Sequence, residues 1–178
     1  DNPVRWVYTP NPDCYLLKSD SLIVRVDLST ASITYLDKEG GLLLQEDQNI
    51  PRISEKRVTK QVIYDEHSKH IEKTADGDKE IKNVLRYDTI GHTWKYRINF
   101  KWQPLEALYG WGAHMEDYMN LRGKELYLCQ HNLKAMVPVL NSTAGYGLLF
   151  DAGCAMMFKD NSEGSFVELE VAKQIDYY

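Results

Sequence analysis

Acidic residues in the middle of the chain are of types that could do acid–base chemistry. Glu116 and Asp117 are adjacent. Neighbours on an extended chain point to opposite sides, so these two cannot face one substrate as an acid and base pair without a bend. Glu106 precedes Tyr-Gly-Trp-Gly, which we interpret as a turn, and could return towards them. A solvated loop is the favoured interpretation, and no residue is assigned a catalytic role.

Histidines could bind a metal or a polar ligand, and the chain has five of them, at positions 67, 70, 92, 114 and 131. His67 and His70 lie in a polar segment with no identifiable third ligand, so a surface turn is favoured over a metal site. His114 and His131 could meet across a sheet, either to bind a ligand or in buried hydrogen bonds. We expect no metal and no cofactor.

Nucleophilic side chains give little support for catalysis. Ser142 lacks the Gly-x-Ser-x-Gly elbow of many hydrolases. The run from Asn141 to Thr143 fits a glycosylation acceptor, but its residues are also good turn formers, and the turn is favoured. No phosphate-binding glycine loop occurs. The three cysteines are far apart and odd in number, which favours buried free thiols over a disulfide framework.

The bulk properties indicate one globular domain over residues 1–178. The net charge is −5 and the 21 Lys and Arg residues are scattered, which argues against nucleic acid as a partner. No apolar run is long enough for a membrane span. A start at Asp1 fits either a mature chain after signal-peptide removal, hence a periplasmic or secreted protein, or an excised piece. The last residues, 175–178, stop as if cut.

Apolar alternation predicts strands along most of the chain. The clearest covers 93–102, where Trp94, Tyr96, Ile98, Phe100 and Trp102 share one face, which must meet another sheet. Further strands are predicted at 22–28, 32–36, 42–45, 57–64, 79–87, 125–130, 135–141, 147–151, 155–158 and 165–172. A hairpin loop is predicted at 37–41, and an irregular lead-in at 1–14. No 3.6-residue period is sustained, so the predicted fold class is all-β, an antiparallel β-sandwich.

Five of the eleven glycines lie between Glu106 and Asp151, at positions 110, 112, 123, 145 and 147. Glycines beside large residues are typical of bulges, tight bends or close backbone approach. Tyr-Gly-Trp-Gly (109–112), Leu-Arg-Gly-Lys (121–124), the strand up to Asn132, Val-Pro (137–138) and Gly-Tyr-Gly-Leu-Leu-Phe-Asp (145–151) occur in an order that resembles the N-terminal domain of glycoside hydrolase family 31. The hairpin at 33–43 and the segment 175–178 are similar to family segments too.

The resemblance implies a galactose-mutarotase-like sandwich that packs on a catalytic (β/α)8 barrel of the same protein. It also implies an α-linked oligosaccharide, a glucoside or xyloside, as the parent enzyme's substrate. The family's Trp-x-Asp-Met-x-Glu nucleophile segment is absent from this chain. We therefore expect a non-catalytic domain that supports the barrel and lends a loop to the substrate site.

Two positions depart from the family pattern. Ala113 stands where the family usually has Glu, and Asn132 stands where a strand-terminal Asp reaches substrate hydroxyls in relatives. Asn132, His131 and Trp111 are the candidate substrate-binding residues, with Trp111 or Tyr127 as an aromatic wall. Two other interpretations stay open: an independent carbohydrate-binding module, and a mutarotase that uses His92 or His131 with Glu106.

Overall fold

The computed structural model describes residues 4–178, and over that range the protein is built from antiparallel strands. Its only helix there is one 3-10 turn, η1 (Glu66–Ser68). The prediction of an all-β antiparallel fold is therefore confirmed. Across the same residues, no helix is long and apolar enough to cross a membrane.

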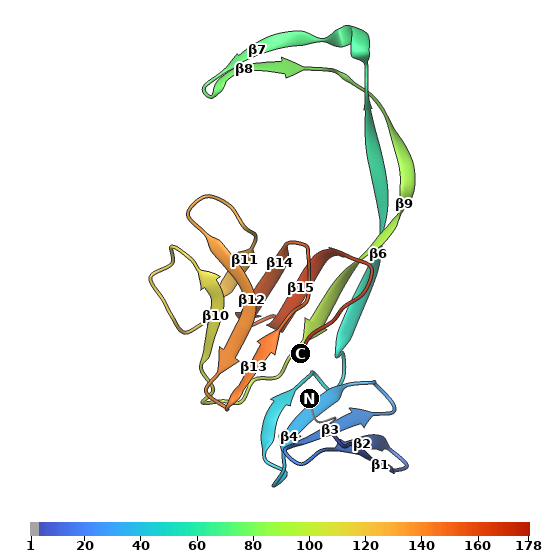
Figure 1. Cartoon of the computed structure of the whole chain (residues 1–178), viewed down its shortest axis with the longest axis vertical. Coiled ribbons are helices and arrows are strands. Elements are labelled where there is room, and N and C mark those ends of the chain that lie inside the picture. Colours follow the sequence, from blue (N-terminus) through green and yellow to red (C-terminus); the bar gives the residue numbers. More distant parts are fainter. Residues whose placement is uncertain (1–3) are drawn as a thin grey trace. The chain divides into compact units, whose positions relative to one another are not determined.

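Two compact units make up the chain. One takes in the described residues up to Glu55 together with Lys95–Tyr178, and the other is Lys56–Trp94. The smaller unit contains most of the long strands β6 (Arg52–Tyr64) and β9 (Val84–Asn99) and the hairpin of β7 (His70–Thr74) and β8 (Gly77–Ile81) (Figure 1). Its strand β6 is exposed at most positions.

The larger unit contains the sandwich. A three-stranded sheet joins β10 (Leu108–Ala113), β12 (Ala135–Ser142) and β13 (Tyr146–Leu149). A five-stranded sheet runs in the order β11 (Glu125–Leu128), β14 (Met156–Asn161), β15 (Gly164–Ala172), β9 and β6. Side chains of both sheets form one core, in which Trp111 on β10 lies 5.9 Å from the ring of Phe158 on β14. The sandwich prediction is therefore confirmed.

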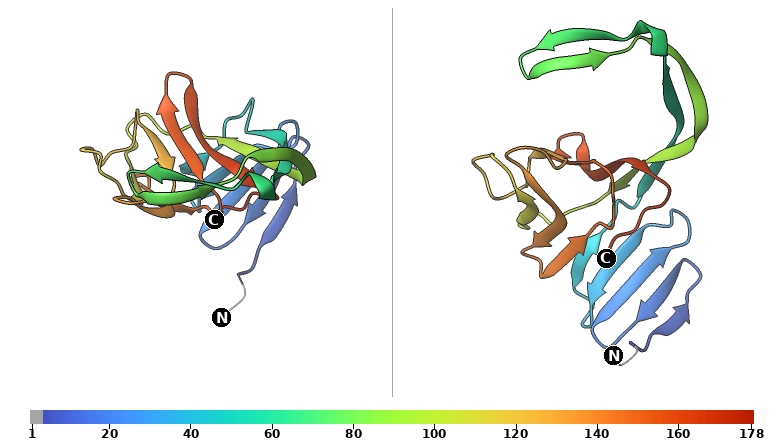
Figure 2. Two further views of the ribbon diagram at one scale, coloured as in Figure 1. Left: turned by 90° about the horizontal axis from the view of Figure 1, so that it is seen from above. Right: turned by 45° about the horizontal axis from the view of Figure 1, so that its top comes forward.

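A further five-stranded sheet forms the N-terminal part of the same unit, in chain order: β1 (Val7–Pro10), β2 (Cys14–Lys18), β3 (Leu22–Asp27), β4 (Ile33–Asp37) and β5 (Leu42–Gln45) (Figure 2). A buried carboxylate ties it to the core. Glu46 is fully buried and accepts hydrogen bonds from Arg52 at 2.7 and 2.8 Å, from Tyr177 Oη at 2.7 Å and from the Ile33 amide at 2.9 Å. Burial is the main reason that the pKa of Tyr177 is raised, so its phenol stays a donor.

Most predicted strands are present, and the errors have physical causes. The irregular lead-in predicted at 1–14 was wrong at β1 and at Cys14, where β2 begins, and its residues 1–3 lie outside the described residues; β1 is exposed throughout and so shows no apolar alternation. Leu28 lies beyond β3 and is exposed. The strand predicted at 79–87 is broken between β8 and β9. Of the face predicted along 93–102, Ile98, Phe100 and Trp102 are buried, whereas Trp94 is 36% exposed. All three cysteines are free, but only Cys14 is buried.

The segment interpreted as a Tyr-Gly-Trp-Gly turn is strand β10, paired with β12 across a register shift between Gly110 and Gly112. Gly110, Trp111 and Gly112 all have positive φ, at 129°, 63° and 94°. A Cβ on Gly112 would overlap the carbonyl oxygen of Ala135 on β12. The glycines therefore permit a close backbone approach, as predicted, and of these three residues Trp111 alone carries the strain of a side chain on a left-handed backbone.

Candidate functional site

The loop between β11 and β12, residues 129–134, carries two of the three candidate binding residues. The Gln130 side chain closes its base, since Nε2 donates to the Lys134 carbonyl at 2.8 Å and Oε1 accepts from the Met136 amide at 3.1 Å. The Lys134 amide donates to the His131 carbonyl at 3.1 Å. This network fixes a short turn whose tip, Asn132 and Leu133, is exposed.

At that tip the polar groups are of the kind that bind hydroxyls. His131 Nδ1 lies 2.7 Å from the Asn132 carbonyl oxygen, which can only accept, so Nδ1 donates. In the neutral ring Nε2 is then an acceptor. The Asn132 amide offers both donors and acceptors without a charge. Leu133 has a φ of 69° and is 78% exposed, which completes the tight turn.

A second loop, residues 114–124 between β10 and β11, meets the first through an ion pair. Lys134 Nζ donates to Glu116 Oε1 at 2.9 Å, and this bond holds the pKa of Glu116 below its ordinary value. Glu116 Oε2 lies 3.9 Å from His114 Nδ1. His114 Nε2 in turn lies 2.7 Å from the Trp111 carbonyl oxygen. The chain of contacts therefore connects the 129–134 loop with the glycine-flanked bulge of β10.

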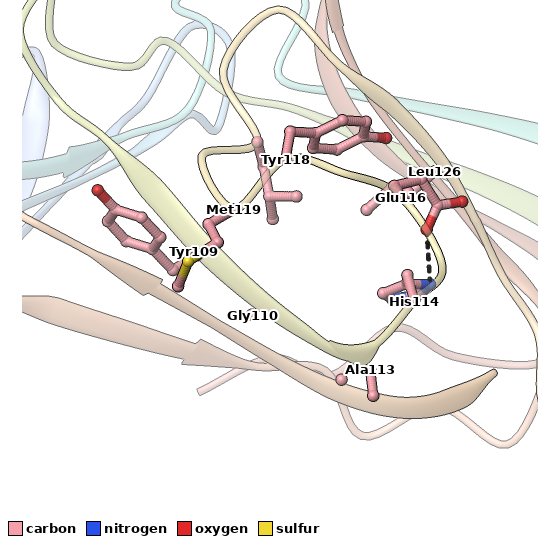
Figure 3. Close-up of a pocket in the computed structure, with 10 residues that line it drawn as sticks. Tyr109, Gly110, Ala113, His114, Glu116, Tyr118, Met119 and Leu126 are labelled. Carbon is pink, nitrogen blue, oxygen red and sulfur yellow. Dashed lines mark ion pairs between the residues drawn. The ribbon is translucent and has the colours of Figure 1, made fainter. Parts of the chain in front are cut away.

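The 114–124 loop encloses a cavity of about 270 Å3 against β10. Figure 3 shows His114 and Glu116 at one end of it and Tyr109 and Met119 at the other. Its remaining lining residues are Gly110, Gly112, Ala113, Tyr118, Leu121 and Leu126. One end of the cavity is therefore polar and the other is aromatic and apolar.

The aromatic candidates differ in exposure. Trp111 has no exposed surface and packs on Phe150 and Phe158, with ring centroids 5.7 and 5.9 Å apart. Core residues therefore cover the face of the Trp111 ring. The ring also supports the backbone of β10, where the Trp111 carbonyl oxygen contacts His114. Tyr127 is 42% exposed on β11.

Glu106 does not return to Glu116 and Asp117, which corrects the expectation drawn from a turn at 109–112. It is buried and accepts hydrogen bonds from the Gln103 amide at 2.7 Å, from Ser142 Oγ at 2.5 Å and from the Tyr146 phenol. Burial, followed by the Glu106 carboxylate, raises the pKa of that phenol. Glu106 is thus engaged in structural hydrogen bonds, which weakens the mutarotase interpretation.

The remaining candidates belong to other elements of the chain. His67 belongs to η1 and His70 begins β7, and both are exposed. In the part of the chain that the structure describes, no three His, Cys, Asp or Glu side chains gather as a metal site. Ser142 closes the turn before β13, where its hydroxyl accepts from the Ala144 amide at 2.9 Å, as the turn interpretation expects.

Sequence reasoning did not identify Lys134 and Gln130, and it considered His114 and Glu116 only separately. Lys134 and Glu116 are 18 residues apart and on different loops. No periodic pattern marks such a pair, because the contact depends on how β10, β11 and β12 are arranged. The one available signal was a charged residue, Lys134, two positions after Asn132.

Comparison with known proteins shows which enzymes this chain resembles. No protein-family model matches the chain. Over 91 residues it is 32% identical to an uncharacterized family 31 glucosidase of Pseudescherichia vulneris, covering 49% of this chain and 17% of that protein. The chain thus spans about a sixth of the length of this curated relative.

Solved structures of family 31 enzymes resemble this chain over a larger part of its length. A family 31 α-xylosidase from a soil metagenome, complexed with xylose, superposes with a TM-score of 0.68 at 18% identity, covering 99% of this chain and 24% of that one. A family 31 dextranase of Flavobacterium johnsoniae gives 0.63 at 18% identity, covering 97% and 18%. A family 31 α-xylosidase of Xanthomonas citri gives 0.62 at 22% identity, covering 89% and 14%. The chain is a domain similar in sequence and structure to a small portion of family 31 glycoside hydrolases.

Proposed function

We propose that this chain is a non-catalytic N-terminal domain of a larger α-glycosidase that acts on α-linked glucosides or xylosides. In this proposal the sandwich is of the galactose-mutarotase-like type and packs on a (β/α)8 barrel that carries the catalytic groups. The 129–134 loop reaches the rim of the substrate site, where Asn132 and His131 bind hydroxyls of the oligosaccharide. Trp111 acts from the core, where it fixes β10.

The observation that carries the proposal is the way the 129–134 loop is built. Its base is closed by Gln130 and held by the Lys134–Glu116 pair, while its tip exposes an amide and an imidazole. A rigid loop with neutral polar groups can bind sugar hydroxyls at a low entropic cost. Its position in the chain also falls within a portion shared with family 31 enzymes.

The isolated chain gives the first test. Purified free of host glycosidases, it should not hydrolyse p-nitrophenyl α-glucoside or α-xyloside, because the proposal places the catalytic carboxyl groups on the barrel. Hydrolysis that stays with the chain through purification would contradict the proposal.

The parent enzyme gives the second test. Asn132→Ala there should lower kcat/KM on an oligosaccharide by about tenfold, the loss of one or two hydrogen bonds to hydroxyls. Asn161→Ala, at the end of β14 and outside both loops, is the matched control and should leave kcat/KM unchanged. Equal kcat/KM for Asn132→Ala and the wild type would refute the role of the loop.

A further inference from the structure

Two buried acceptors face one another at the polar end of the cavity between β10 and the 114–124 loop. His114 Nε2 lies 2.7 Å from the Trp111 carbonyl oxygen, which can only accept, so Nε2 carries the proton and donates. In the neutral ring, Nδ1 then carries no proton and can only accept a hydrogen bond. It lies 3.9 Å from Glu116 Oε2, and neither atom has a hydrogen-bond partner.

This arrangement is unfavourable unless donors are supplied. The His114 side chain is only 8% exposed, and both acceptor atoms are shielded from bulk water. Leaving a buried polar atom unsatisfied costs about 1–3 kcal/mol, and more for a charged group. Lys134 does not meet this need, because its ammonium bonds to the other carboxylate oxygen, Oε1. With the His114 ring neutral, two donors are therefore required, directed at two acceptors that lie 3.9 Å apart.

The rest of the cavity selects what can bring those donors. Its volume of about 270 Å3 is close to the lower end of small-molecule pockets, roughly 300 Å3, and is too large for one water alone. Tyr109 and Met119 line the opposite end (Figure 3). An aromatic ring opposite a polar pair suits a molecule with hydroxyls on one edge and C–H groups on the other.

We propose that this cavity binds one small ring with two adjacent hydroxyls, a pentose or hexose unit, one hydroxyl donating to His114 Nδ1 and the other to Glu116 Oε2. The ring carbons lie towards Tyr109 and Met119. The site is distinct from the tip of the 129–134 loop, since neither Asn132 nor His131 lines it, although Lys134 of that loop bonds to Glu116. All of its lining residues belong to this chain, so the chain by itself can be tested for binding.

The test is an NMR titration of the 178-residue chain at pH 8, where an ordinary imidazole is neutral. The probes are D-xylose, D-glucose, trans-cyclohexane-1,2-diol and cyclohexanol. The sugars and the diol should give saturable shifts at residues 109–119 with a Kd of about 1 mM or weaker, as expected for so few hydrogen bonds. Cyclohexanol, which has one hydroxyl, should bind at least about tenfold more weakly.

Variants separate binding from folding. Glu116→Gln and His114→Phe should each weaken sugar binding about tenfold or more. Glu163→Gln and His67→Phe make the same changes at exposed positions and should leave it unchanged. Should His114→Phe fail to fold, the His114 ring-nitrogen shifts of the wild type answer the question, because Nδ1 should move on addition of xylose as it gains a donor.

Three results would overturn the proposal. One is the absence of saturable shifts at about 100 mM xylose and diol in a chain that is folded by its spectrum. Another is equal binding of cyclohexanol and the diol. The third is a crystal soaked in xylose that shows an ordered water, and no sugar, between His114 and Glu116. None of these bears on the 129–134 loop or on the parent enzyme.

Discussion

Replacing Gly112 with Ala should destabilise the protein by about 3 kcal/mol. The φ of 94° at this position is one that a side chain rarely adopts, which costs about 1–2 kcal/mol. The new Cβ would also overlap the Ala135 carbonyl and crowd the Val137 amide on β12. Overpacking of this kind costs about 1–3 kcal/mol, because a paired strand cannot move aside freely. The loss is a large fraction of a typical stability of about 5–15 kcal/mol.

Two other glycines serve as controls that separate these effects. Gly123 has a φ of 72°, and no heavy atom lies within 4 Å of the place that an alanine methyl group would take, so Gly123→Ala should cost about 1 kcal/mol from the backbone alone. Gly153 has neither positive φ nor a close neighbour. Gly153→Ala should therefore be close to neutral.

Urea unfolding followed by tryptophan fluorescence and by circular dichroism gives the measurement. Coincident transitions by the two probes would justify a two-state treatment for a chain with two compact units. The expected order of destabilisation is Gly112→Ala, then Gly123→Ala, then Gly153→Ala. If Gly112→Ala costs no more than Gly123→Ala, the close approach of β10 to β12 is not a constraint and the reasoning fails.

Three further outcomes are expected. Glu46→Gln should lower the free energy of unfolding by about 2–3 kcal/mol in urea melts, since it leaves a guanidinium without its buried carboxylate; a change below about 0.5 kcal/mol would contradict this. The pKa of Asp27 should be about 2 in a carboxyl NMR titration, chiefly because the Ser29 hydroxyl donates to this carboxylate, and Ser29→Ala should raise that pKa. Because the pKa of Asp27 is lower in the folded protein than the ordinary value for Asp, its ionised form stabilises the fold at pH values above that ordinary pKa. This stabilisation is lost as the pH falls towards 2. Lys134→Met should raise the pKa of Glu116 towards its ordinary value and speed amide exchange in the 129–134 loop; an unchanged titration would mean that the ion pair does not form in solution.

The strands of the sandwich could be predicted because the burial of their side chains alternates along the chain. Strands such as β11 and β14 have one face in the core, so buried residues alternate along them with exposed or half-buried ones. Strand β1 escaped detection for the opposite reason, since it is exposed on both faces and contains Pro10.

The candidate site could be predicted only in part. The importance of the glycines at 110 and 112 was visible in the sequence, whereas Asn132, expected at the end of a strand, lies at the tip of the 129–134 loop beyond β11. The sequence did not show which group each charged side chain contacts. Glu106 was grouped with Glu116 because a turn was expected between them, yet strand β10 occupies that segment, and Glu106 bonds instead to Ser142 and Tyr146.

The sequence by itself determined an all-β antiparallel chain and a central stretch in which backbones must pass closely. Both follow from local rules, namely the period of two along a strand and the absence of a Cβ in glycine. Only the tertiary structure decided that Trp111 is buried in the core and that His114 and Glu116 share a cavity. Such contacts join residues whose distance is set by the packing of sheets and not by their spacing along the chain.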